Sequence, residues 1–420
     1  MIEPDFDGDF HCIGGQCSFT CCKEWKIAVD HETKKRWRKM DVPETVLESG
    51  RVPEHAYRRV TDGVMLDRFV VKKDGGEIIE LLPNMRCPFL EDTELCRLVL
   101  DYGEECLSET CHVFPRETHE FPDRTERTLV SCCPEIVDRL HELKEMHFTN
   151  LPYQDRAFLL EGNAVWRKGR DAAAYQDCGF RSEGRDKLFQ IRNIMMYYLN
   201  DASVSNEVNL KRCLFMILDL FDKKTKEKML DPGECLKEDD VQKLTEMILA
   251  MPKDTQASIE EQNALFLDIT ENYRKEGRYQ GLLNPLYAMA EQLSHEFEEA
   301  DAVRMDEISA LHAEVVAAYA PLLRNYLVAE AFATLLIPGC TLRDMVLQLE
   351  WMIMEYVLIV HAMVLEILSE DAPLAYPKAR ELLILIARMT GYDGDEIEDY
   401  LSDSFENPVW PWGYADYLLA

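Results

Sequence analysis

Cysteine is the residue type whose number and spacing carry the clearest chemistry in this chain. Ten of its 14 cysteines lie at or before residue 133, and four of these fall in the short run HCIGGQCSFTCCKEW. The ten are Cys12, Cys17, Cys21, Cys22, Cys87, Cys96, Cys106, Cys111, Cys132 and Cys133. Thiolates are the ligands that soft metals prefer, so this bunching indicates metal binding.

Buried core cysteines or a disulfide scaffold would be the alternatives to a metal site. Core cysteines would be scattered, but the chain beyond residue 133 holds only Cys178, Cys213, Cys235 and Cys340. Disulfides need an oxidising compartment, and the opening MIEPDFDGDF has four acids and no basic or apolar signal region. We therefore expect a cytoplasmic protein whose cysteines bind metal.

The spacing of the thiols favours an iron–sulfur cluster, most simply a [4Fe–4S] cluster, with zinc as the alternative. Zinc sites usually show paired CxxC knuckles, and this chain has none. A cluster spread over several ångströms accepts ligands from several loops. Adjacent Cys21 and Cys22 project in different directions on most backbones. Both bind one compact centre only if the chain bends sharply there; otherwise one is structural or serves a second centre.

Short motifs surround these cysteines in a fixed order along residues 10–135. They are Phe10-His11-Cys12-Ile13-Gly14, Cys21-Cys22-Lys23-Glu24-Trp25, Cys87-Pro88-Phe89-Leu90, Leu95-Cys96, Leu107-Ser108-Glu109-Thr110-Cys111, Phe114-Pro115-Arg116 and Cys133-Pro134-Glu135. In these motifs the chain resembles the flagellin lysine-N-methylase family and, more loosely, proteins with a cysteine-rich zinc- or iron-chelating domain.

The resemblance implies a bacterial enzyme that transfers methyl groups from S-adenosylmethionine to lysines of flagellin and needs an iron–sulfur cluster. Cys106 and Cys132 depart from the family pattern, so we interpret both as extra thiols. The implied metal ligands are Cys12, Cys17, Cys21, Cys22, Cys87, Cys96, Cys111 and Cys133. Eight thiols exceed what one cluster needs. The motifs identify neither catalytic nor S-adenosylmethionine-binding residues.

Local patterns predict the elements that position these thiols. Residues 65–71 and 77–82 flank Asp74-Gly75-Gly76 and predict a β-hairpin that leads into Cys87. A helix over 31–40 would be capped by Asp30. Pro134 suits the first turn of a helix over 134–146, which places Cys133 at a helix N-terminus, where the macrodipole favours a thiolate.

Beyond residue 148 the apolar spacing becomes that of amphipathic helices. The expected segments are 184–200, 206–230, 237–251, 257–276, 285–300, 304–335, 341–369, 376–390 and 395–403. Segment 351–368 is interrupted by Glu355, His361 and Glu366, so we expect a central bundle helix with a hydrogen-bonded core histidine instead of a membrane span. The prediction is a mainly α chain: a cysteine-rich metal-binding domain with a small hairpin over 1–147, packed on an all-α domain over 148–420.

The charge of the chain bears on its partners. A net charge of −32 repels nucleic acids and anionic membranes and attracts lysine-bearing protein surfaces. Neither a phosphate loop nor a GxGxxG fingerprint occurs, so a pocket for S-adenosylmethionine would be unconventional. The alternative to a methyltransferase is a non-catalytic metal-stabilised helical scaffold, or a redox or electron-transfer partner.

Overall fold

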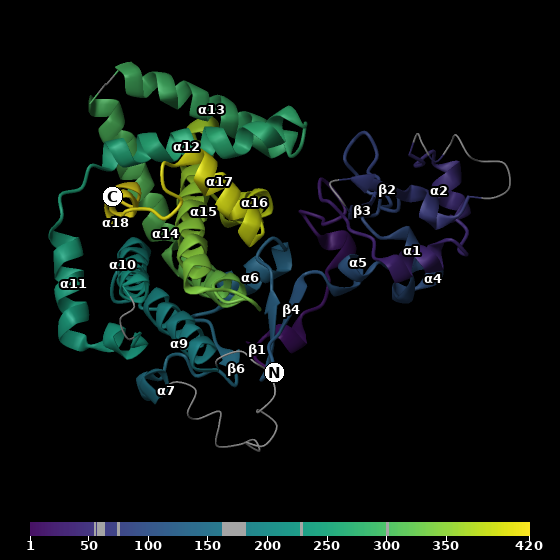
Figure 1. Cartoon of the computed structure of the whole chain (residues 1–420). Coiled ribbons are helices and arrows are strands. Elements are labelled where there is room, and N and C mark those ends of the chain that lie inside the picture. The colour runs from purple at the N-terminus through teal and green to yellow at the C-terminus, as the bar shows by residue number, and fades with distance from the viewer. Residues whose placement is uncertain (54–55, 57–63, 74–75, 162–181, 227–229, 300–301) are drawn as a thin grey trace.

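The computed structural model describes the chain except residues 54–55, 57–63, 74–75, 162–181, 227–229 and 300–301. The protein is mainly α-helical, as predicted, and its strands form small antiparallel pairs, of which the sequence predicted the β2–β3 hairpin. Figure 1 shows a helical bundle on one side and a smaller N-terminal part on the other, which carries β2, β3 and the short helices α1, α2, α4 and α5.

The helices of the bundle follow the predicted amphipathic segments closely. They are α7 (Arg156–Glu161), α9 (Ser182–Leu199), α10 (Asn206–Thr225), α11 (Glu238–Ala250), α12 (Thr255–Lys275), α13 (Gln280–Glu299), α14 (Ala302–Thr334), α15 (Leu342–Glu370), α16 (Tyr376–Met389), α17 (Gly394–Ser404) and α18 (Trp412–Leu418). Helix α13 begins at Gln280 instead of Pro285, so this proline lies inside the helix and not in its first turn. The sequence predicted neither α7 nor α18.

Helix α15 is the central helix of the bundle, as predicted (Figure 1). It is long and apolar enough to cross a membrane, but 78% of its most apolar window is buried inside the protein. Glu355 accepts a hydrogen bond from the hydroxyl of Thr390, and buried His361 lies 2.9 Å from Oδ1 of Asn263. His361 is therefore the hydrogen-bonded core histidine that the sequence indicated.

The N-terminal part contains short elements joined by loops. The helices that precede residue 147 are η1 (Asp7–Asp9), η2 (Gly14–Gln16), α1 (His31–Trp37), α2 (Glu44–Glu48), η3 (Leu66–Phe69), α4 (Arg97–Tyr102), η4 (Glu104–Cys106), α5 (Glu109–Val113) and α6 (Pro134–Glu142). Of these, α6 packs against α14 and α16 of the bundle. Asp30 caps α1, because its Oδ1 accepts from the Thr33 amide at 2.8 Å. The predicted hairpin is present but shorter, with β2 (Val70–Lys73) paired with β3 (Gly76–Ile79). Residues 66–69 form a 3-10 turn and not a strand.

A second hairpin, which the sequence did not predict, joins the two parts of the protein. It pairs β4 (Arg116–Glu120) with β5 (Thr125–Leu129), and its turn contains Pro122-Asp123. Strand β1 (Glu3–Pro4) pairs with β6 (Phe148–Thr149). Buried Glu126 binds the guanidinium of buried Arg192 on α9, with Nη2 3.0 Å from Oε1, and this ion pair fixes the hairpin to the bundle.

The apolar side chains form two hydrophobic cores. The small core contains buried residues between Ile27 and Cys106, including Trp37 and Phe89. The large core lies in the bundle, but Ile2, Phe10 and residues from 121 to 148 also contribute to it. The division of the chain after residue 147 stays a prediction. The residues that precede and follow the small core in the sequence belong to the large core together with the bundle helices.

Glu350 of α15 gives a test of how burial affects the stability of the bundle. Its side chain is buried, and Oε1 accepts from the Trp410 amide at 2.8 Å. Burial raises the pKa of this carboxyl to about 8. The folded state therefore binds the proton more tightly than the unfolded state, and this group costs increasing stability as pH rises from about 4.5 to about 8.

We expect Glu350→Gln to stabilise the protein by roughly 2 kcal/mol at pH 8–9 and to change little near pH 5. Urea unfolding at both pH values measures the difference. Exposed Glu370 on the same helix provides the control, since Glu370→Gln should change stability equally little at both pH values. An equal effect of Glu350→Gln at both pH values would contradict the assignment.

Candidate functional site

The first cysteine segment, residues 12–22, depends on two glycines for its position. Gly14 has φ of +50°, which favours glycine. A Cβ on Gly15 would lie 2.6 Å from the Thr93 carbonyl oxygen, too close for any other residue. These glycines let the first cysteine segment approach the loop between Cys87 and Cys96.

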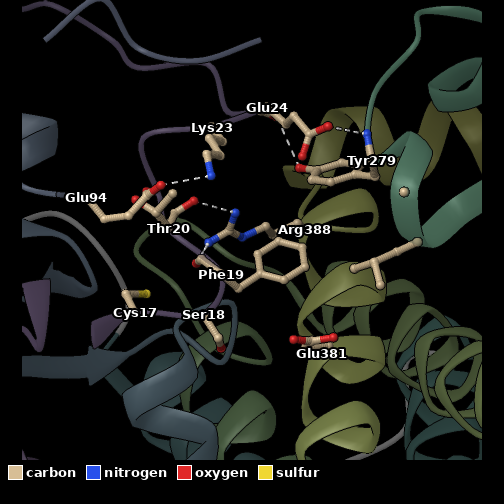
Figure 2. Close-up of a pocket in the computed structure, with 12 residues that line it drawn as sticks. Cys17, Ser18, Phe19, Thr20, Lys23, Glu24, Glu94, Tyr279, Glu381 and Arg388 are labelled. Carbon is tan, nitrogen blue, oxygen red and sulfur yellow. Dashed lines mark hydrogen bonds and ion pairs between the residues drawn. The ribbon is translucent and has the colours of Figure 1, made fainter. Parts of the chain in front are cut away.

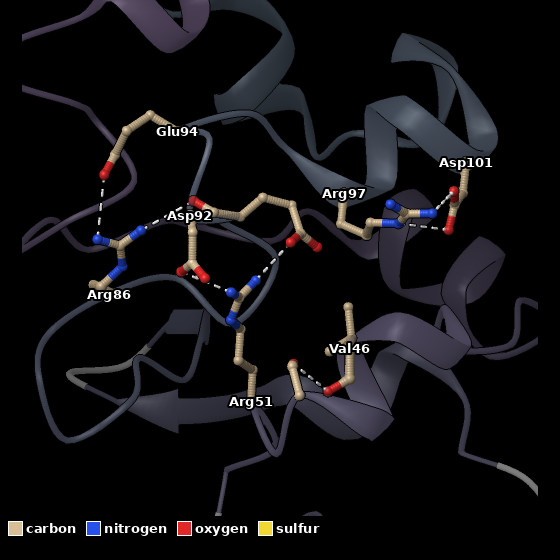
Figure 3. Close-up of polar contacts among 9 residues, drawn as sticks. Val46, Arg51, Arg86, Asp92, Glu94, Arg97 and Asp101 are labelled. Carbon is tan, nitrogen blue, oxygen red and sulfur yellow. Dashed lines mark hydrogen bonds and ion pairs between the residues drawn. The ribbon is translucent and has the colours of Figure 1, made fainter.

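The loop between Cys87 and Cys96 is fixed by arginines (Figure 3). Arg51 binds the carboxylates of Glu91 and Asp92 at 2.9 and 2.8 Å. Arg86 binds Oε1 of Glu94 at 3.2 Å and the Glu91 carbonyl at 3.1 Å. These contacts hold the acidic tip of the loop, so the two cysteines at its ends are positioned by a fixed backbone.

Backbone pairing and helix starts place the remaining thiols. The Cys87 amide donates to the Cys22 carbonyl at 2.8 Å, which joins the first two cysteine segments. Cys96 is the N-cap of α4 and Cys133 the N-cap of α6, with Pro134 at the first turn. Cys111 lies in the first turn of α5, where its amide donates to Ser108 Oγ at 3.3 Å. The prediction that Cys133 starts a helix is confirmed.

The thiols lie close enough to influence one another's ionisation. Burial, and then neighbouring thiols, raise the pKa of Cys17, Cys87, Cys96 and Cys111, the last to about 12. A hydrogen bond with Cys22 lowers the pKa of Cys21 to about 7. A metal needs thiolates, so metal binding to this group would release protons.

The assignment of eight metal ligands stays a prediction. Within the described ranges, no three or more His, Cys, Asp or Glu side chains are arranged to hold a single metal ion. The cysteines that we interpret as packed thiols include Cys106, whose Sγ donates to the Leu98 carbonyl at 3.4 Å, and buried Cys132, Cys213 and Cys235. Cys340 is half-buried and bonded to backbone carbonyls. Cys178 lies outside the described residues.

A pocket of about 360 Å³ opens between the first cysteine segment and the bundle (Figure 2). It is lined by Cys17, Ser18, Phe19, Thr20, Lys23 and Glu24, by Glu94, by Tyr279, Gly281 and Leu282 at the start of α13, and by Glu381 and Arg388 of α16. The rings of Phe19 and Tyr279 lie 6.1 Å apart. Cys17 therefore belongs both to the thiols and to the wall of this pocket.

Arg388 connects the bundle to the cysteine segments. Its guanidinium donates to the carbonyls of Phe19 at 2.9 Å, Thr20 at 3.1 Å and Cys132 at 3.3 Å. It also lies over the rings of Phe19 and Trp25, 4.4 and 5.3 Å from their centroids. The buried positive charge of Arg388 favours thiolates nearby, and it lowers the pKa of Cys21 after the hydrogen bond with Cys22.

Glu24 and Tyr279 form a second contact across the pocket (Figure 2). Oε1 of Glu24 accepts from the Tyr279 amide at 2.6 Å, and the Tyr279 hydroxyl donates to the Glu24 carbonyl at 3.1 Å. Both residues have positive φ, 57° and 51°. Residues other than glycine rarely adopt a positive φ, and they keep it only where the surrounding structure holds them in place. Burial raises the pKa of Tyr279 to about 12, so its hydroxyl remains a donor at neutral pH.

The chain is similar to a protein named for flagellar biosynthesis. It is 32% identical over 145 residues to the flagellar biosynthetic protein FliU of Salmonella muenchen, a match that covers 76% of that relative and 33% of this chain.

This chain belongs to the FliU family.

Two proteins named lysine-N-methylase also match. The chain is 30% identical to the one from Salmonella choleraesuis (strain SC-B67) and 31% identical to the one from Salmonella typhimurium (strain LT2), each over 143 residues. The matched region is 33% of this chain and spans about a third, 32%, of each lysine-N-methylase. No protein-family model matches the chain, and no solved structure matches it significantly.

Sequence reasoning about this FliU-family protein missed the pocket residues of the bundle. Tyr279 and Arg388 are far from the cysteines in sequence, and no motif marks them. One feature of the sequence could have pointed to Arg388. It is the single charged residue in the apolar run LLILIARM of a predicted helix. A charge on a buried face needs a partner, but the sequence does not say which backbone supplies it.

Removal of Arg388 should weaken the contact between the cysteine segments and the bundle. Arg388→Met would leave three carbonyls without this donor, so we expect a loss of roughly 2–4 kcal/mol in the free energy of unfolding. Urea unfolding measures it. Arg343→Met removes a half-exposed ion pair with Glu398 and should cost less than about 1 kcal/mol. Equal effects of the two variants would refute this role of Arg388.

Proposed function

We propose that this protein is an S-adenosylmethionine-dependent lysine N-methyltransferase that acts in the cytoplasm on flagellin or a similar bacterial surface protein. The names of the FliU and lysine-N-methylase relatives support a role in flagellin lysine methylation. The observation that carries the proposal is the pocket beside the thiols, whose walls suit a lysine side chain.

The walls of the pocket combine aromatic rings with carboxylates. Tyr279 and Phe19 line the pocket with rings, which attract organic cations, and Arg388 already lies over the Phe19 ring. Glu24 and Glu381 add carboxylates to the wall, while Glu94 is paired with Lys23 and Arg86. The two basic residues of the wall are already engaged: Lys23 binds Glu94 at 3.3 Å and Arg388 binds backbone carbonyls. The pocket therefore favours a cationic, partly apolar guest, as a lysine side chain is.

The reaction would use the same groups. The lone pair of a neutral lysine amine attacks the sulfonium methyl, the carbon–sulfur bond breaks, and S-adenosylhomocysteine leaves with the electron pair. The amine must lose a proton, and a wall carboxylate such as Glu381 or a water molecule would accept it. Enclosure between the cysteine segment and α16 would hold the amine in line and exclude solvent.

The cysteines would hold an iron–sulfur cluster. The iron and sulfide content of the purified protein is the first test. Thiolates from several loops are the donor set that such a cluster takes, and when bound it would contribute its binding free energy to the folding of those loops. We expect protein purified without oxygen to be brown and to contain stoichiometric iron and acid-labile sulfide. If the protein is colourless and contains only zinc, the cysteines bind zinc and not an iron–sulfur cluster.

The activity itself can be tested by mass spectrometry. Protein purified without oxygen and incubated with flagellin and S-adenosylmethionine should add mass to flagellin in methyl increments on lysines. Calorimetry should show binding of S-adenosylmethionine. If metal-loaded protein shows neither binding nor methylation, the scaffold or electron-transfer interpretation replaces the methyltransferase.

Glu381 provides a test of the pocket. Glu381→Gln removes one wall charge, so we expect the KM for a lysine-bearing flagellin peptide to rise about tenfold, which corresponds to ~1.4 kcal/mol. Binding of S-adenosylmethionine should not change. Glu398→Gln is the matched control, since Glu398 is an ion-paired acid of α17 that does not line the pocket. An unchanged KM in Glu381→Gln would mean that the lysine binds elsewhere. It would not contradict the methyltransferase activity.

A further inference from the structure

The pocket in which we propose that a substrate lysine binds already contains a lysine of the chain itself. Lys23 lines it, and the Lys23 Nζ lies 3.3 Å from Oε1 of Glu94 (Figure 2). Solvent reaches both side chains, since 35% of the Lys23 side chain and 25% of the Glu94 side chain are exposed. Among the residues that the structure describes, this ammonium pairs with Glu94 alone. The wall of the pocket therefore already binds one primary ammonium group.

The Glu94 carboxylate is held in place by contacts that do not involve Lys23. The Glu94 amide donates to the Glu91 carbonyl at 3.0 Å, which closes a tight turn at the tip of the loop. Arg86 donates to Oε1 of Glu94 at 3.2 Å and to the Glu91 carbonyl at 3.1 Å (Figure 3). Because the turn and Arg86 fix the carboxylate, it would stay at the pocket if the Lys23 ammonium moved away.

The Glu94 carboxylate also has acceptor capacity that its partners do not use. Lys23 and Arg86 both donate to Oε1, whereas Oε2 is buried and has no hydrogen-bond partner among the described residues. A buried carboxylate oxygen without a donor is unfavourable. An ammonium group carries three donors, so this carboxylate suits a lysine that approaches it more closely than Lys23 does.

The backbone on either side of Lys23 is fixed independently of its side chain. The Cys22 carbonyl and the Glu24 amide are each hydrogen-bonded at 2.8 Å to the segment 85–87. A lysine side chain is a single charge on a flexible four-carbon stem. The Lys23 ammonium can therefore leave Glu94 by rotation of its stem, while the first cysteine segment keeps its position.

We propose that Glu94 is the carboxylate that binds the ammonium of the substrate lysine, and that Lys23 occupies this position until the substrate displaces it. One ammonium replaces another in this exchange, so the net charge around Glu94 does not change. A partly exposed ion pair is weak, so the loss of the contact between Lys23 and Glu94 costs the substrate little. The inference rests on the proposed function, because it requires that the pocket accepts a lysine.

Binding of a lysine-bearing flagellin peptide to the metal-loaded protein measures the exchange. Lys23→Met removes the competing ammonium and keeps an apolar stem, so the Kd of the peptide should fall about fivefold. Glu94→Gln removes the acceptor, so the Kd should rise about tenfold. In the double variant, Lys23→Met should no longer tighten binding, because its effect depends on the Glu94 carboxylate.

Two matched variants separate displacement of Lys23 from a general effect of charge or folding. Lys35→Met makes the same change of charge at an exposed lysine, which pairs with Glu32 at 3.5 Å and does not line the pocket, and it should leave the Kd unchanged. Lys23→Arg keeps the charge but binds a carboxylate more firmly, so it should weaken binding of the peptide. Damage to the site would weaken binding in both Lys23 variants, so opposite effects cannot come from misfolding.

A peptide whose lysine is acetylated tests whether the ammonium is the group that Glu94 recognises. It carries no positive charge at that position, so wild type and Lys23→Met should bind it equally. If wild type binds the unmodified peptide and Lys23→Met binds it no more tightly, or if Lys35→Met tightens binding as much, Glu94 is not the ammonium site and the proposed function stands. If neither wild type nor Lys23→Met binds the unmodified peptide, the proposed function itself is contradicted.

Discussion

The buried guanidinium of Arg388 is the contact on which the arrangement of the site depends. One side chain of α16 donates to carbonyls of the first cysteine segment and to the carbonyl of Cys132, next to the start of α6. These segments are far apart in the sequence, and each lacks long regular secondary structure to hold it. The same side chain lines the pocket, so the positions of the thiols and of the pocket wall are set together.

Polar groups also fix other junctions within this protein. Glu126 and Arg192 attach the second hairpin to the bundle, and Ser131 donates to Glu330 of α14 at 2.7 Å. Burial raises the pKa of Glu330 to about 8. Buried polar groups of this kind are costly unless paired, and pairing is directional. We infer that they select one way of seating the N-terminal segments on an apolar bundle.

The chemistry proposed for the site agrees with its physical setting. Burial keeps most of the thiols protonated until a metal displaces their protons, so the loops and the metal would order together. The adjoining pocket has aromatic and carboxylate walls, while its two basic residues are engaged within the protein. In the proposed function a cationic side chain would be attracted there, and the acidic surface of the chain would draw lysine-bearing proteins toward it.

The sequence by itself determined the features that depend on near neighbours. Apolar periodicity located most bundle helices, Asp30 and Pro134 marked helix starts, and the Gly-containing turn marked the β2–β3 hairpin. Interruption of the apolar run by Glu355, His361 and Glu366 identified α15 as a core helix. The sequence did not predict β4 and β5, because RETHE and TERTL are polar. Their pairing is stabilised by contacts with β1 and α9, which lie far away in the sequence.

Only the tertiary structure decided which distant segments meet. Cys22 and Cys87, Glu24 and Tyr279, and Phe19 and Arg388 are joined by contacts that carry no local sequence signal. A hydrogen bond or a ring contact between such pairs depends on the packing of whole elements, whereas a helix or a turn depends on residues a few positions apart. For that reason the sequence could give the list of thiols, but only the fold could place a pocket beside Cys17.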